Sequence, residues 1–195
     1  MTQRSSNVHE RRGRQLGAMN AILHSHGRFT VLNQDENTQN ISVQITRNLF
    51  QYFGADSIIL DQNVEASSGT GNVIRVAFGS EPALPELDGY PISIEHGSGI
   101  SVRDASGKNL FYALDKGLGA VFLRPMPEER LELVVWGVDD IGLGQAARLV
   151  PMLTGVGQAD FVILSKECLS TGAQGVLAMG FFDHLWNVTK ASYLT

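Results

Sequence analysis

The sequence has little cysteine and no long hydrophobic run, and each shortage excludes a class of protein. Its one cysteine, Cys168, cannot form a disulfide within the chain, so a disulfide-stapled fold is excluded. No apolar stretch reaches the roughly 18–20 residues that a membrane-spanning helix needs, so we expect no membrane partner. The chain has 195 residues, which is enough to bury a sizeable apolar core without a structural metal.

The N-terminal residues, MTQRSSNVHERRGRQ, lack the apolar centre of a signal peptide. On the residues alone we therefore expect a soluble chain that stays in the cytoplasm. Two Asn-x-Ser/Thr sequons occur, NIS at 40–42 and NVT at 187–189. They acquire meaning only in a chain that enters a secretory pathway.

Charge is unevenly spread along a chain whose formal net charge is −5. A basic segment of this kind can bind nucleic acid, but this one has no aromatic residue before Phe29 to stack on bases. We therefore interpret it as a solvated helix face or an interdomain contact, and expect no nucleic-acid partner. The five basic residues of the segment 1–28 are Arg4, Arg11, Arg12, Arg14 and Arg28.

Hydrophobic periodicity predicts two strand–helix–strand units. The first helix is amphipathic, with Thr38 or Asn40 as its N-cap and Gly54 at its end. Apolar strands on both sides of a helix indicate a parallel crossover. We expect the four strands at 29–32, 57–60, 130–137 and 159–165, and the apolar strands at 57–60 and 159–165 should be buried. The buried face of the second helix is expected to comprise Leu143, Ala146, Ala147, Val150 and Leu153.

The middle of the chain is rich in hairpin signals. A strand is expected at 72–79, followed by a hairpin around Gly97 and Gly99, and the segment PEER predicts a second hairpin at 127–130. The predicted fold class is therefore α/β. Its architecture is a three-layer sandwich with a mixed β-sheet, in which two βαβ units flank the hairpin-rich middle.

Three regions are expected along the chain: a basic N-terminal segment (1–28), a single α/β domain (29–183) and a C-terminal tail (184–195). The N-terminal segment should contain a helix over 8–26 that Gly27 ends. The end of the chain is too apolar for a disordered tail, so its large side chains should pack on the domain or dock elsewhere. These side chains are Phe181, Phe182, Leu185 and Trp186.

Two glycine-containing loops are candidates for phosphate or nucleotide binding. The turn at 137–140 joins a strand to a helix, as a phosphate site requires, but Asp139 and Asp140 would repel the anion. We interpret these two acids as helix caps. In SSGTGN (67–72), Gly69 and Gly71 are the candidate cofactor-binding residues, although a dinucleotide fingerprint should open a helix and this loop precedes a strand.

A complete catalytic or metal-binding constellation is missing from the sequence. The nucleophile elbow G-x-S-x-G is absent, and His96 and Ser98 share a predicted hairpin turn; together with Asp139 they are the candidate catalytic residues of a site assembled from distant segments. Asp61 and Asp115 are further possible general acids. No H-x-x-x-H, C-x-x-C or H-E-x-x-H spacing occurs, so we expect no metal site and no cofactor. Cys168 has no neighbouring histidine and is interpreted as a structural or surface thiol.

The stretches GLGAVFLRPMPEERLELVVWGVDDIGLGQAARLVPMLTGVGQADFVIL (117–164) and NISVQITRNLFQYFGADSIIL (40–60) resemble the C-terminal accessory region of large fungal secreted proteins of the α/β-hydrolase or prolyl-oligopeptidase-like type. The likeness extends from residue 11 to 183. In that group the hydrolase unit and its Ser-Asp-His triad lie upstream, so the resemblance transfers no catalytic residue. It implies a secreted, hydrolase-associated chain.

Three hypotheses for function follow. The leading one is a non-catalytic accessory domain that contacts another protein or a neighbouring hydrolase unit. The second is a small hydrolase that uses the distant residues named above. The third is a module that binds a nucleotide or a glycan. The sequence leaves the oligomeric state open.

Overall fold

The computed structural model describes residues 10–61, 69–82, 84–150 and 158–195. The described helices are α1 (Glu36–Phe53), α2 (Asp140–Ala147) and α3 (Cys168–Thr171), with 3-10 turns η1 (Gly13–Gln15), η2 (Met19–Leu23) and η4 (Gly172–Gly175). The described strands are β1 (Phe29–Asn33), β2 (Ser57–Asp61), β3 (Val73–Phe78), β4 (Ile92–Glu95), β5 (Gly99–Arg103), β6 (Asn109–Ala113), β7 (Gly119–Pro125), β8 (Leu131–Gly137), β9 (Phe161–Leu164), β10 (Val176–Gly180) and β11 (Tyr193–Leu194).

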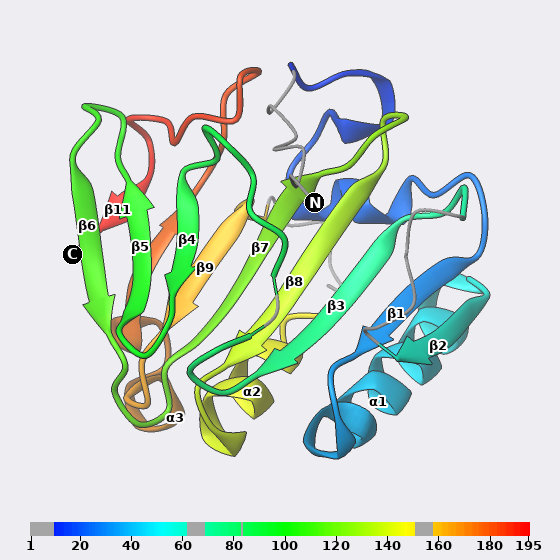
Figure 1. Ribbon diagram of the computed structural model, residues 1–195, viewed down its shortest axis with the longest axis horizontal. Coiled ribbons are helices and arrows are strands. Elements are labelled where there is room, and N and C mark those ends of the chain that lie inside the picture. The colour runs from blue at the N-terminus through cyan, green and yellow to red at the C-terminus, as the bar shows by residue number, and fades with distance from the viewer. Residues whose placement is uncertain (1–9, 62–68, 83, 151–157) are drawn as a thin grey trace, which may run out of the picture.

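Two sheets and a helical layer form the architecture. The large sheet has the strand order β11-β10-β9-β7-β8-β3-β1-β2, and the small antiparallel sheet has the order β4-β5-β6. Figure 1 shows α1 and α2 behind the large sheet and the small sheet in front of its β11 end. The structure therefore confirms the predicted α/β class, with a mixed sheet and a three-layer arrangement.

The first predicted βαβ unit is β1–α1–β2. Strands β1 and β2 are parallel neighbours in register from Phe29↔Ser57 onward. The N-cap is Asp35, whose carboxylate accepts the amides of Asn37 and Thr38. The prediction of Thr38 or Asn40 as the cap was wrong, because the helix begins one turn earlier and holds both residues. Gly54 ends α1 with a left-handed φ of 60°, as predicted.

The second predicted unit is β8–α2–β9, and its two strands are not neighbours. Strand β7 lies between them and is antiparallel to both, so β8 and β9 run parallel to each other with one strand in between. The short predicted hairpin fixes β7 beside β8, and α2 then has to cross it. The expected helix face is buried at Leu143, Ala146, Ala147 and Val150, while Leu153 lies outside the described residues.

The prediction of one helix over 8–26 was wrong. The part of this segment that is described, from residue 10 onward, forms only the short turns η1 and η2. Gly13 and Gly17 have φ values of 44° and 119°, which a right-handed helix does not permit. The periodic apolar residues are nevertheless used, since Met19 and Ile22 are buried in the common core.

A buried ion pair fastens the N-terminal segment to the far end of the chain. The Arg11 guanidinium lies 3.1 Å from the carboxylate of Asp160 and 4.6 Å from the ring centroid of Trp186. The Arg11 amide also donates to the carbonyl of His184. Phe182 and Trp186 are buried in the same core, whereas Phe181 and Leu185 are exposed. Part of the predicted basic surface is thus an internal contact.

We predict that Arg11→Met lowers the free energy of unfolding by about 3–5 kcal/mol at neutral pH, because it leaves the carboxylate of Asp160 buried without its partner. Burial already raises the pKa of Asp160 above its ordinary value, and Arg11 opposes this only in part. In the variant, protonation removes the unpaired charge, so its deficit relative to wild type should shrink as the pH falls through the raised pKa. Urea unfolding at several pH values measures this; a deficit that does not change with pH would contradict it.

Candidate functional site

The turn that joins β8 to α2 is held by the side chain of Asp139. One carboxylate oxygen accepts the amide of Gly142 at 2.9 Å, which caps the helix, and the other accepts the amide of Gly117 at 3.0 Å. Asp140 is in the first turn of α2. The carboxylate therefore occupies the place that a phosphate would take at this helix N-terminus.

Close packing also fills the space in front of α2. A Cβ on Gly137 would lie 1.9 Å from the amide nitrogen of Leu143, and a Cβ on Gly142 would lie 2.0 Å from the carbonyl oxygen of Leu118. These two glycines are thus needed for the helix to approach the strand ends. The turn at 137–140 joins and caps, as the acids in the sequence indicated.

The second glycine-containing loop, of which residues 69–72 are described, is also packed on the protein. A Cβ on Gly71 would lie 2.1 Å from the carbonyl oxygen of Arg28, while Gly69 has only a distant neighbour. The Asn72 side chain is buried and donates to the carbonyl of Ile22. Strand β3 follows directly, so no helix begins here. A nucleotide site at Gly69 and Gly71 stays a prediction.

The three candidate catalytic residues make separate contacts. Ser98 and His96 lie in the exposed turn between β4 and β5, where the Ser98 hydroxyl donates to the carbonyl of His96 at 3.2 Å and not to its imidazole. In the described part of the chain, no hydrogen bond joins the side chains of Ser98, His96 and Asp139. A hydrolase site built from them stays a prediction.

The structure also bears on the predictions for the cysteine, for metal binding and for a membrane span. Burial raises the pKa of the Cys168 thiol above its ordinary value, which lowers the fraction of reactive thiolate. Among the described residues, no three His, Cys, Asp or Glu side chains gather closely enough to hold a metal ion. None of the described helices has both the length and the apolar character to cross a lipid bilayer.

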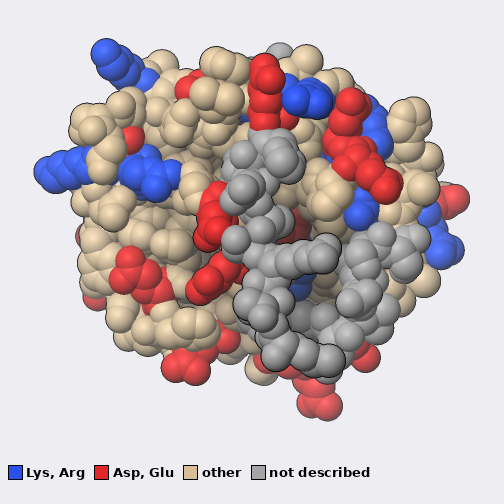
Figure 2. All heavy atoms as spheres, turned by 45° about the horizontal axis from the view of Figure 1, so that its top comes forward, with Lys and Arg blue, Asp and Glu red and all other residues tan. Residues whose placement is uncertain are grey.

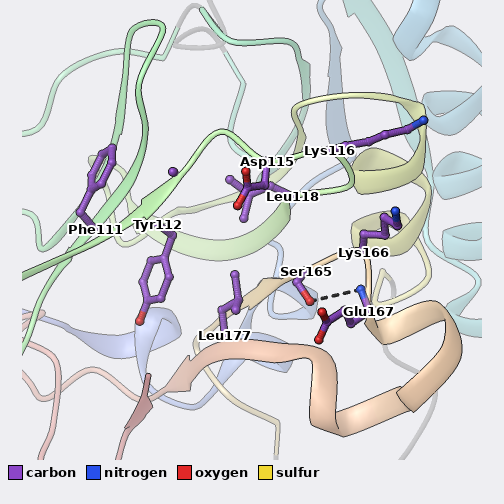
Figure 3. A pocket seen from close by; sticks show the side chains of 10 residues that line it. Phe111, Tyr112, Asp115, Lys116, Leu118, Ser165, Lys166, Glu167 and Leu177 are labelled. Carbon is purple, nitrogen blue, oxygen red and sulfur yellow. Dashed lines mark hydrogen bonds between the residues drawn. The ribbon is translucent and has the colours of Figure 1, made fainter.

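A pocket of about 360 Å³ lies where the small sheet meets the end of the large one. Strand β6 supplies one wall, the link between β6 and β7 another, and the residues after β9 a third (Figure 3). In the sequence, Asp115 is one acid among many. The pocket could not be predicted, because the walls of the pocket come from segments that are distant in the sequence. Its lining residues are Phe111, Tyr112, Ala113, Asp115, Lys116, Leu118, Ser165, Lys166, Glu167 and Leu177.

The lining of this pocket combines two aromatic residues, whose rings extend to opposite sides of β6, with two carboxylates. Figure 3 shows Phe111 and Tyr112 on one side, Glu167 on the other, and the amino groups of Lys116 and Lys166 extending away from the aromatic rings. Next to Glu167, the Ser165 hydroxyl accepts the Glu167 amide at 3.2 Å and donates to the carbonyl of Gly175 at 2.8 Å. Backbone groups therefore hold this serine hydroxyl in place.

A second pocket, of about 320 Å³, lies between residues 84–90, β4 and β7. It is lined by Arg124, which is paired at 3.1 Å with Glu132; the same carboxylate binds Arg75 at 2.6 Å. All three side chains are buried, and Arg124 also donates to the carbonyl of Pro85. These contacts fasten residues 84–90 to the large sheet. We therefore assign a structural role to the three charged side chains.

Charged side chains are dispersed over the face that Figure 2 shows. Basic side chains lie around its margin with acidic ones between them, and acidic side chains lie beside the grey atoms. Within the basic N-terminal segment, Arg11 turns inward to Asp160, and Arg14 donates to the carbonyl of Glu128 at 2.8 Å. The side chains of these two arginines are therefore used in contacts within the chain.

The sequence is similar to part of a larger fungal protein. Over 193 residues it is 42% identical to a protein of the fungus Arthroderma benhamiae that is named an uncharacterized secreted protein. The match takes in 96% of this chain but only 20% of that protein, so the chain spans about a fifth of the relative's length. No protein-family model matches the sequence.

Two glycines of α2 provide a matched test of the packed turn. We predict that Gly142→Ala lowers the free energy of unfolding by about 1–3 kcal/mol, because the new methyl group would collide with the carbonyl of Leu118. Gly144→Ala, two residues on and with open space around it, should raise it by about 0.5–1 kcal/mol through helix propensity. Chemical denaturation of both variants checks the pair; effects of the same sign would contradict the packing described above.

Proposed function

We propose that this chain is a non-catalytic accessory domain of a larger secreted protein, in which it contacts a neighbouring hydrolase unit of the peptidase- or esterase-like type. The proposed docking unit is residues 29–183, with the described parts of 1–28 and 184–195 packed against it as flanking segments. The observation that carries the proposal is an exposed apolar surface at one end of the large sheet.

This surface, the α1–β2 end, consists of Phe50 and Phe53, which lie three residues apart on one face at the end of α1, together with the edge strand β2. Phe50 and Phe53 are 65% and 39% exposed, although phenylalanine is among the residue types most often buried. The sequence predicted a buried strand at 57–60, and this was wrong: β2 is half exposed because, among the described strands, it pairs only with β1. An exposed apolar edge is a template for a further strand.

The neighbour is an extended segment of the same larger polypeptide. In support, the fungal relative has about four fifths of its length outside the match. A segment that adds to β2 would gain backbone hydrogen bonds, and its side chains would cover the rings of α1. The resemblance to accessory regions of secreted hydrolases supports the hydrolase as the unit that carries this segment.

The test is to titrate the purified chain against the part of the Arthroderma benhamiae relative that lies outside the matched region, by calorimetry. We expect measurable binding that Phe50→Asp weakens about thirtyfold, the effect of losing an aromatic worth about 2 kcal/mol at an interface. Leu169→Asp is the matched control, because Leu169 is also a large apolar residue that is more than half exposed, at 54%, but lies on α3. Absence of binding, or equal weakening by both variants, would overturn the proposal.

A second candidate function is glycan binding in the pocket beside β6. The ring of Phe111, which is 51% exposed, offers an apolar face for a sugar ring, and Asp115 and Glu167 offer acceptors for its hydroxyl groups. The volume lies within the range of small-molecule sites. This support is independent of the α1–β2 end.

For this candidate we predict that at least one neutral oligosaccharide in a calorimetric panel binds the chain. Phe111→Ala and Asp115→Asn should each weaken that binding about tenfold, or about 1.4 kcal/mol. Phe53→Ala, at the other end of the sheet, should leave it unchanged. The candidate is rejected if no sugar binds, or if binding is indifferent to both pocket variants.

A further inference from the structure

The sequon at 187–189 lies in a surface turn whose side chains alternate in burial. Trp186 and Val188 are buried, and Asn187 between them is exposed. The turn is closed by an antiparallel bridge between Phe182 and Val188. Its backbone is further fixed by Asp183, which donates its amide to the carbonyl of Asn187 at 2.8 Å. This geometry holds the Asn187 amide on the outside of the molecule.

We propose that Asn187 is an N-glycosylation site. The inference rests on the secretion proposed above, because only a chain in a secretory pathway meets the enzyme. The amide nitrogen Nδ2 of Asn187 attacks the anomeric carbon of an oligosaccharide carried on a lipid diphosphate. A nitrogen–carbon bond forms, the carbon–oxygen bond to the diphosphate breaks, the lipid diphosphate leaves, and Nδ2 loses one proton.

The folded turn accommodates the modification. The Asn187 side chain makes one hydrogen bond, from Nδ2 to the carboxylate of Asp183 at 3.2 Å, and a glycosylated amide keeps one hydrogen for it. The same carboxylate also accepts the backbone amide of Asn187 at 2.9 Å, so the turn does not depend on the side-chain bond. The glycan would extend into solvent from a fixed base.

Exposed apolar side chains beside the sequon give a second reason for a glycan here. Leu185 is 52% exposed and Phe181 39% exposed. Thr189, the third residue of the sequon, donates its amide to the carbonyl of Phe181 at 2.9 Å, which brings Phe181 next to the modified turn. An attached oligosaccharide is bulky and solubilising, and at Asn187 it would shield both side chains.

The other sequon, at 40–42, lies in a different setting. Asn40 is exposed but belongs to α1, and the hydroxyl of Ser42 is buried, where it donates to the carbonyl of Thr38 at 3.0 Å. A sequon acceptor is typically a surface loop, and the transferase must reach the hydroxyl of the third residue. Helix formation hides that hydroxyl, so Asn40 serves as the internal comparison.

The test is to express the full chain behind a foreign signal peptide in a yeast and to measure the occupancy of each asparagine by mass spectrometry, before and after treatment with peptide-N-glycosidase. Because the signal is supplied, a missing glycan is distinguishable from a failure of natural secretion. We expect Asn187 to be occupied in most of the secreted molecules, and Asn40→Gln to leave that occupancy unchanged.

Three variants of the sequon decide the outcome. Asn187→Gln and Thr189→Ala should abolish the glycosidase-sensitive mass at this turn, and Thr189→Ser should keep it, since serine also completes the sequon. The Thr189 pair alters the same side chain twice, so it separates glycosylation from a general loss of folding. Secreted wild-type chain with an unmodified Asn187, or a glycan found at Asn40 alone, would overturn the proposal.

Discussion

The carboxylate of Asp139 binds two separate stretches of backbone where β8 meets α2, and α2 lies in the lower part of Figure 1. With one oxygen it caps α2, and with the other it holds the turn at Gly117 that leads into β7. This turn is followed by Leu118 and preceded by Asp115, both of which line the pocket beside β6. A single side chain therefore sets the distance between a helix, a sheet end and a pocket wall.

The same contact shows how an internal carboxylate satisfies a helix N-terminus that has the geometry of a phosphate site. A helix N-terminus attracts anions because its first amides lack partners. In this chain an internal carboxylate supplies that anion, and the glycines of the turn bring backbone against backbone instead of opening a cradle. The surfaces that we propose for binding lie elsewhere. They are the pocket between the two sheets and the exposed end formed by α1 and β2.

Local patterns predicted the helices and hairpins that neighbouring residues determine. The acids at 139–140 indicated a cap, Gly54 a helix end, and the alternating residues around Gly97 a hairpin. The errors arose where tertiary contacts override local preference. The helix expected before Phe29 is interrupted where Gly13 and Gly17 adopt positive φ angles, and Arg11 is paired with Asp160 in the folded chain. The pocket was missed because β6 and the segment after β9 meet only in the folded chain, and neither carries a motif.

The contact between Arg11 and the distal part of the chain has a consequence for the order of folding. Its partners Asp160 and Phe182 are 149 and 171 residues away in the sequence, so a large entropic cost of chain closure precedes any gain from the pair. During synthesis, β1, α1 and β2 can assemble before the ribosome has released residues 160–182. Until then the Arg11 side chain remains solvated. Within this chain, the segment that holds Arg11 is thus expected to become ordered later than the strands that follow it.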